Sequence, residues 1–214
     1  MRIAILTTAR TGSTCLYHLI ENHLPKSYVC ISEPFNNHWR DKINLNTYDI
    51  DFFENKSDVF IKTFVSKLQR PKSLLENDSK FWVWFFKYFD KIILLDRLDK
   101  DLQSESLTYH LKKNDISSWQ KPQKYDLSNI SKDEIFTTKD ILINDANLIN
   151  EFNKIGYPLF YYEDIFLKKD KNVIECMFDY IGLNLNKIQY DIHITSDFWK
   201  IRIDDTVSNL KKII

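Results

Sequence analysis

The sequence predicts an α/β protein with three layers, in which helices cover both faces of a central parallel sheet of about five strands. Short apolar runs have the continuous hydrophobicity of strands that are buried on both faces. Segments with helical spacing of apolar residues separate these runs, and such alternation is typical of parallel sheets. The chain also begins with an apolar run, a glycine-containing turn and a helical pattern in direct succession.

The expected elements alternate from the start of the chain to residue 181. Strands are expected at 2–8, 28–32, 58–64, 91–96 and 157–162. Helical patterns fall at 13–23, 74–89, 101–113, 140–154 and 171–181. Neither a repeat nor a change of composition interrupts this order, so we expect a single domain over residues 1–214. Ligands are expected at the carboxyl ends of the strands.

The stretch from Lys112 to about Asp140 is polar and has no clear periodicity. Long segments of this kind within a compact domain are often functional. It is expected to be either a lid or acceptor-binding insertion, or a solvated surface insertion.

The turn after the first expected strand has the composition of an anion-binding loop. Gly12 allows the backbone to approach a phosphate, and the N-terminus of the following helix offers N–H groups and a favourable dipole. Ser13 and Thr14 add hydroxyl groups, and Arg10 supplies a planar fork of donors. Alternatively, Ser13 or Thr14 is only the N-cap of the helix.

This loop differs from the Walker A motif, which ends in Gly-Lys-Ser/Thr. Here one glycine is preceded by Arg10, and no lysine follows it. A nucleoside triphosphate with its metal ion is therefore not the expected ligand.

The composition of the chain excludes several classes of protein. Thirty basic residues balance thirty acidic ones, which argues against general binding of nucleic acid or of anionic membranes. The cysteines at 15, 30 and 176 are expected to be reduced core thiols. The chain shows no secretory leader, and the apolar segment 81–86 is too short to cross a bilayer. We expect a soluble, cytoplasmic protein without a metal site.

A second anion site is predicted after the fourth strand. Arg97 leaves the end of that strand, and Ser106 lies in the next expected helix, which could turn its hydroxyl toward the same anion. The alternative is a surface ion pair of Arg97 with Asp99 or Asp101.

Two further residues are candidates for chemistry. Glu33 follows the second strand and precedes Pro34, which favours extended backbone, so its carboxylate could serve as a general base. Alternatively, Glu33 is solvated or pairs with Arg40. Lys62 lies inside the third strand, where a charge needs a partner or a ligand, unless its head reaches solvent. His18 could reach the loop but is more simply a half-buried helix residue.

Two segments resemble those of sulfotransferases that use 3′-phosphoadenosine-5′-phosphosulfate (PAPS). The segment RTGST at 10–14 resembles their 5′-phosphosulfate loop, in the arginine-containing form of carbohydrate sulfotransferases. The segment RLDKDLQSES at 97–106 is similar to their 3′-phosphate motif, in the R-x-D-K-x-x-Q-x-x-S form of bacterial trehalose-type sulfotransferases.

Further likenesses follow in the family's order. They are SEPF at 32–35, FIKT at 60–63, Trp119, YYEDI at 161–165 and RIDDTVSNL at 202–210. The catalytic lysine of cytosolic sulfotransferases is here Arg10. The chain is compact for the family, so part of the acceptor site could be trimmed or supplied by a partner subunit.

The resemblance implies a fold like that of P-loop NTPases and in-line transfer of a sulfuryl group. It implies that residues 11–14 (Thr11, Gly12, Ser13 and Thr14) with Arg10 hold the 5′-phosphosulfate. Arg97 and Ser106 would hold the 3′-phosphate, with Ser104 competing for that role. Glu33 would be the base, and Arg10 and Lys62 would stabilise developing charge. The acceptor would be a small molecule or a glycan, most simply a hydroxyl of a carbohydrate or glycolipid.

Two other functions stay open at this stage. A P-loop-type nucleotide kinase would share the strand–loop–helix start, with Asp96 as the carboxylate for Mg²⁺, but its lysine is missing. A non-catalytic relative would bind the nucleotide without transfer. The oligomeric state is also open, a homodimer included. Aromatic residues could stack on a sugar or on adenine: Trp39, Trp82, Trp84 and Trp119, of which Trp82 and Trp84 are expected in the core.

Overall fold

A computed structural model describes residues 1–35, 50–66, 78–113 and 127–183 of the chain. Five parallel strands form one sheet in the order β2-β3-β1-β4-β5. These strands are β1 (Arg2–Thr7), β2 (Val29–Ser32), β3 (Val59–Phe64), β4 (Lys91–Asp96) and β5 (Leu159–Tyr161). The helices are α1 (Ser13–Glu21), α3 (Ile50–Glu54), α5 (Asp78–Tyr88), α6 (Lys100–Lys113), α7 (Lys132–Lys154), the π-helix η2 (Glu163–Leu167) and α8 (Lys171–Tyr180). The prediction of a central parallel sheet of five strands is confirmed.

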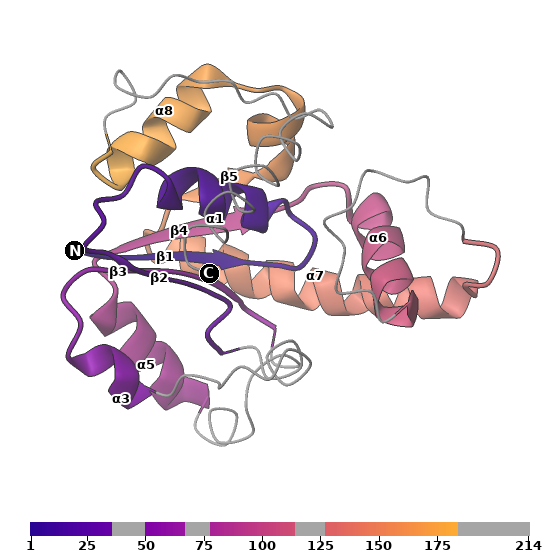
Figure 1. Cartoon of the computed structure of the whole chain (residues 1–214). Coiled ribbons are helices and arrows are strands. Elements are labelled where there is room, and N and C mark those ends of the chain that lie inside the picture. Colours follow the sequence, from indigo (N-terminus) through magenta and orange to yellow (C-terminus); the bar gives the residue numbers. More distant parts are fainter. Residues whose placement is uncertain (36–49, 67–77, 114–126, 184–214) are drawn as a thin grey trace, which may run out of the picture.

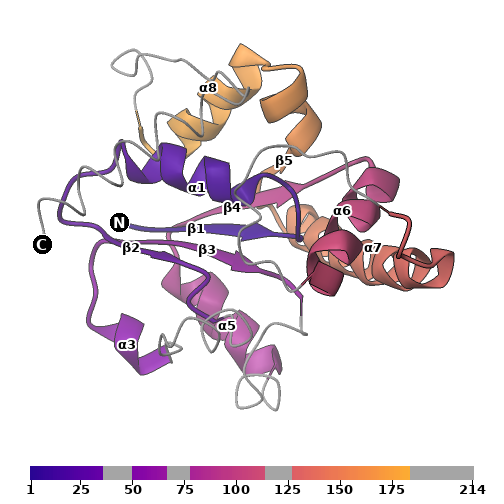
Figure 2. The same ribbon diagram turned by 45° about the vertical axis from the view of Figure 1, so that its right-hand side comes forward.

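Helices cover both faces of the sheet, as the sequence predicts (Figure 1). Alternate residues of β1 explain how this arises, because Ile3 and Ile5 point to one face while Ala4 and Leu6 point to the other. On the first face, α1, η2 and α8 complete one hydrophobic cluster. On the second face, α3, α5 and α7 complete another. Figure 2 shows the same three layers after a rotation of 45°.

The strand order places β1 at the centre, between β3 and β4. The chain moves from β1 to β2 and β3 on one side, then crosses to β4 and β5 on the other. Ligands of open parallel sheets bind at such a reversal, outside the carboxyl ends of the strands. The loop after β1 and the start of α6 after β4 both lie at this edge (Figure 1).

Strand positions agree closely with the prediction, whereas the helices agree less well. Helix α7 begins at Lys132, eight residues before the expected start, because Ser131 and Glu134 form a capping box at its N-terminus. The polar stretch 112–140 is therefore not irregular throughout, since 112–113 belong to α6 and 132–140 to α7. Its residues 114–126 lie outside the described part of the chain, so the lid stays a prediction. The prediction of a single domain likewise stays a prediction.

The cysteines differ from the expected core thiols. Cys176 is exposed, and Cys15 and Cys30 are half-buried. None of the three forms a disulfide, and burial raises the pKa of the Cys30 thiol to about 11. Trp82 and Trp84 pack against the cluster beneath the sheet, as expected. Among the described helices, none is long and apolar enough to cross a membrane.

Candidate functional site

The loop between β1 and α1 has an unusual backbone. Arg10 has φ 60° and Gly12 has φ 70°, both in the left-handed region that non-glycine residues such as Arg10 rarely adopt. Thr11 is buried between them, and its hydroxyl lies 2.6 Å from that of Thr7. A local conformation that costs energy must be held by surrounding contacts, and such conformations cluster at functional sites.

Gly12 is required at its position for two independent reasons. Its positive φ disfavours any other residue. In addition, a Cβ atom at this position would lie 2.7 Å from the Phe166 ring of η2. Phe166 therefore packs directly on the backbone of the loop.

Helix α1 begins at Ser13, directly after Gly12. The N-cap is Gly12, without a side-chain cap bond, so the alternative of Ser13 or Thr14 as the N-cap is wrong. The first N–H groups of a helix have no partner within the helix, and here no N-cap side chain competes for them. The Thr14 hydroxyl instead accepts a hydrogen bond from Lys62, at 2.8 Å.

Lys62 and Glu33 form an ion pair beside the loop. The Lys62 ammonium lies 2.5 Å from Glu33 Oε1, and its side chain is 1% exposed against 15% for Glu33. Lys62 thus has the partner that a charge inside a strand needs, and the alternative of a head that reaches solvent is wrong. Glu33 has φ 55° rather than the extended backbone that Pro34 predicts. Its N–H donates to the Lys62 carbonyl, at 2.7 Å, so backbone and side chain both join Glu33 to β3. Arg40, the other expected partner, lies outside the described residues.

Arg10 and Ser106 belong to one cluster, although the sequence assigns them to two anion sites. Arg10 Nε donates to Ser106 Oγ at 2.9 Å. Ser104, two residues earlier on α6, is fully buried and donates its hydroxyl to the Asp101 carbonyl. Of the two serines, Ser106 is therefore the one that faces the loop.

Arg97 lies between two residues of the segment that follows β5. Its guanidinium carbon is 4.7 Å from the centre of the Tyr162 ring, and its Nε is 3.9 Å from Glu163 Oε1. The alternative pairing with Asp99 or Asp101 is not observed, because Asp99 accepts the N–H of Leu102 and Asp101 pairs with Lys139. Arg97 Nε is buried and forms no hydrogen bond with any described residue. A buried donor of this kind calls for an acceptor.

Sequence reasoning missed the role of Glu163. Its carboxylate accepts the N–H groups of Leu98 and Asp99, at 3.0–3.1 Å. Glu163 thus joins η2 to the turn that carries Arg97. The signals in the sequence are its place just after the last expected strand and its membership of the YYEDI segment at 161–165.

The remaining candidates lie elsewhere. His18 is half-buried and pairs with Glu21 at 2.7 Å, on the last turn of α1, so it does not face the loop. Trp39, Trp119 and the segment 202–210 lie outside the described residues. Within those residues, no group of three or more histidine, cysteine or acidic side chains could hold a metal ion.

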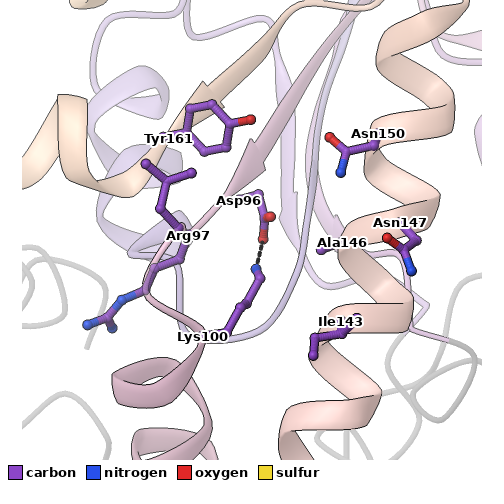
Figure 3. A pocket seen from close by; sticks show the side chains of 9 residues that line it. Asp96, Arg97, Lys100, Ile143, Ala146, Asn147, Asn150 and Tyr161 are labelled. Atoms are coloured by element: carbon purple, nitrogen blue, oxygen red, sulfur yellow. Dashed lines mark hydrogen bonds and ion pairs between the residues drawn. The ribbon is translucent and has the colours of Figure 1, made fainter.

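A cavity of about 270 Å³ opens between the end of β4 and α7 (Figure 3). Asp96 and Lys100 line one side, where they pair at 2.6 Å, and Asn147 and Asn150 line the other. Arg97 also lines this cavity, but its guanidinium extends away from α7 (Figure 3).

Comparisons with known proteins give likenesses to solved structures but no match in sequence. No family model matches the sequence, and no curated protein matches it either. Among solved structures, the crystal structure of mouse sulfotransferase SULT7A1 complexed with PAP is similar, with a TM-score of 0.49 and 16% identity. The match covers 86% of this chain and 59% of the mouse chain. The chain thus spans less than two thirds of that protein's length.

Proposed function

We propose that this protein is a sulfotransferase that moves a sulfuryl group from PAPS to an acceptor hydroxyl. One structural observation carries the proposal beyond the sequence resemblance. Two polar contacts flank the loop after β1. Arg10 donates to Ser106 on one side, and Thr14 accepts from Lys62, which pairs with Glu33, on the other. A group bound by this loop would therefore lie beside cations and a carboxylate.

The loop would hold the 5′-phosphosulfate. Gly12 leaves its backbone without a Cβ, and residues 11–14 lead into the N-terminus of α1, where N–H groups and the helix dipole favour an anion. Arg10 adds a cation whose planar fork of donors suits phosphate and sulfate oxygens. Neither contribution requires a metal ion.

The 3′-phosphate would bind Arg97 and Ser106. The buried Arg97 Nε has no hydrogen-bond partner among the described residues, which fits a site that an anion completes. Ser106 faces Arg10, and Ser104 is held by its own helix, so Ser106 is the better candidate. Because Arg10 contacts Ser106, the two anion sites would adjoin.

Glu33 would act as the general base. As the acceptor oxygen attacks sulfur, its proton passes to the Glu33 carboxylate and the bond from sulfur to the phosphate oxygen breaks. The products are a sulfate ester and adenosine 3′,5′-bisphosphate. The Lys62 ammonium beside Glu33 and the Arg10 guanidinium would stabilise the charge on the sulfuryl and leaving oxygens.

The acceptor follows from the resemblance alone. We propose that the acceptor is a hydroxyl of a carbohydrate or glycolipid and that the protein acts in the cytoplasm. A partner subunit, as in a homodimer, could complete the acceptor site.

A nucleotide kinase fits the site less well. The expected Mg²⁺ ligand, Asp96, already accepts hydrogen bonds from Thr8 and Lys100. The loop also lacks the lysine of the Walker A motif.

A transfer assay tests the proposal. Purified protein is incubated with ³⁵S-labelled PAPS and a panel of mono- and oligosaccharides, and labelled ester is counted beside released adenosine 3′,5′-bisphosphate. We expect Mg²⁺-independent label transfer that Glu33→Gln abolishes. Phosphate transfer from ATP·Mg²⁺ instead would support a kinase, and bisphosphate binding without transfer to any acceptor would support a non-catalytic relative.

A further inference from the structure

The left-handed backbone of Arg10 needs a structural cause. Arg10 carries a Cβ, so φ 60° is unfavourable for it, and no glycine occupies the position. Surrounding contacts must therefore hold the peptide units on either side of Arg10. The peptide unit before Arg10 contains the carbonyl of Ala9, whose orientation sets the rotation about the N–Cα bond of Arg10.

A buried polar cluster holds this carbonyl. We call it the Thr8 network, and it consists of Thr8, Asp96, Lys100 and Gln103. Gln103 Nε2 donates to the Ala9 carbonyl and, at 2.9 Å, to Thr8 Oγ1. Thr8 Oγ1 donates in turn to Asp96 Oδ1 at 2.7 Å. Thr8 and Gln103 are fully buried.

Lys100 completes the network from the first turn of α6. Its ammonium donates to Asp96 Oδ1 at 2.6 Å and to Gln103 Oε1 at 2.9 Å. The Gln103 amide thus uses both donor protons and its acceptor oxygen, and each bond has a different partner. Asparagine is the only other side chain with two amide donors and one amide acceptor in a plane, and it is one methylene shorter.

Gln103 also determines how α6 faces the loop. Ser106 lies three residues further along α6, on the same side of the helix as Gln103. The bonds of Gln103 to Thr8 and Ala9 therefore turn Ser106 toward Arg10, where the two side chains meet at 2.9 Å. One buried amide fixes both members of the pair.

We propose that Gln103 is a positioning residue that holds Arg10 and Ser106 in the geometry for binding the nucleotide, without contacting the nucleotide itself. The identity of the nucleotide in this inference rests on the proposed function. The effect of Gln103 on the loop does not. A preorganised site binds more tightly because its ordering cost is met before the ligand arrives. Loss of Gln103 therefore weakens nucleotide binding by loosening the loop.

Four variants separate positioning from general stability. Gln103→Leu removes the amide, and Thr8→Val removes the hydroxyl while keeping the shape of the side chain. The matched control is Thr108→Val, because Thr108 is buried on the same helix and donates to the Ser104 carbonyl, outside the Thr8 network. Thr8→Ser serves as the conservative rescue.

The experiment combines two readouts with urea unfolding as the measure of stability. Amide hydrogen exchange compares a peptide covering residues 7–16 with one covering β3. Calorimetry measures affinity for adenosine 3′,5′-bisphosphate. For Gln103→Leu and Thr8→Val we expect at least about tenfold faster exchange in the loop and at least about tenfold weaker binding. Thr8→Ser keeps both values near those of the unmodified chain, and Thr108→Val loses stability only.

The outcomes are distinguishable. Equal loop exchange in Gln103→Leu and Thr108→Val would overturn the inference, as would failure of Thr8→Ser to differ from Thr8→Val. If the unmodified chain does not bind the bisphosphate, the proposed function fails, while loop exchange still decides the role of Gln103. If Gln103→Leu does not fold, the two Thr8 variants decide it.

Discussion

Lys62 places a positive charge inside a parallel sheet, where burial of an unpaired ion costs several kcal/mol. Glu33 and Thr14 offset this cost by accepting hydrogen bonds from its ammonium. The same contacts hold the Glu33 carboxylate at the edge of the sheet where the loop after β1 lies. A single residue pair therefore explains both why β3 tolerates a lysine and how a base could be held beside a bound anion.

Glu33→Gln is expected to separate chemistry from binding. Glutamine keeps an oxygen that accepts from Lys62 but cannot take up a proton at neutral pH. Affinity for adenosine 3′,5′-bisphosphate should therefore change little, while the rate of transfer falls by about 100-fold or more, as for loss of a general base. Parallel calorimetry and single-turnover assays measure both. An equal loss of affinity and rate would assign Glu33 a structural role.

Arg97→Ala is expected to weaken binding of the 3′-phosphorylated nucleotide by about 1.5–3 kcal/mol, the usual contribution of a hydrogen bond to a charged group. Affinity for a ligand without the 3′-phosphate, such as AMP, should not change. Titration of both ligands against both proteins gives the comparison. Unchanged affinity for the bisphosphate would remove Arg97 from the site.

At the scale of the elements, the loop after β1 depends on η2, because the Phe166 ring lies where a Cβ of residue 12 would be. Gly156, in the turn after α7, has φ 109°, and a Cβ at that position would meet no atom within 4 Å. Both glycines therefore have a positive φ, but only at Gly12 would an added Cβ collide with a neighbouring side chain.

Gly12→Ala is therefore expected to cost more than Gly156→Ala. Each substitution strains a positive φ by about 1–3 kcal/mol, and overpacking against Phe166 adds about 1–3 kcal/mol at Gly12 alone. Urea unfolding of both variants measures the difference. Phe166→Leu should recover part of the loss in Gly12→Ala and none in Gly156→Ala. Equal costs for the two glycine substitutions would contradict the packing of η2 on the loop.

The elements also explain which predictions succeeded. The strands were predictable because burial on both faces gives continuous apolar runs such as 91–96. The start of α7 was not predictable in this way. Its first turn leaves Phe136 exposed, so the apolar periodicity is weak there. Its signal was the capping box of Ser131 and Glu134.

The whole molecule brings together side chains that the sequence keeps far apart. Because β1 lies between β3 and β4, the loop after β1 can contact Lys62 on one side and α6 on the other. Sequence reasoning named Arg10 from the turn after the first strand and Lys62 because a charge inside a strand needs a partner. It named Ser106 because the helix after the fourth strand could turn its hydroxyl toward the anion of Arg97. It could not predict that Arg10 meets Ser106, because the rotation of α6 depends on the tertiary contacts of Gln103.

The most direct test of the account is a calorimetric titration of the full chain with adenosine 3′,5′-bisphosphate, with AMP and ATP·Mg²⁺ as comparisons. We expect 1:1 binding of the bisphosphate that is at least about tenfold tighter than binding of AMP, because Arg97 and Ser106 would act only on the 3′-phosphate. Mg²⁺ should not change that affinity. Preference for ATP·Mg²⁺, or equal affinity for AMP and the bisphosphate, would contradict it.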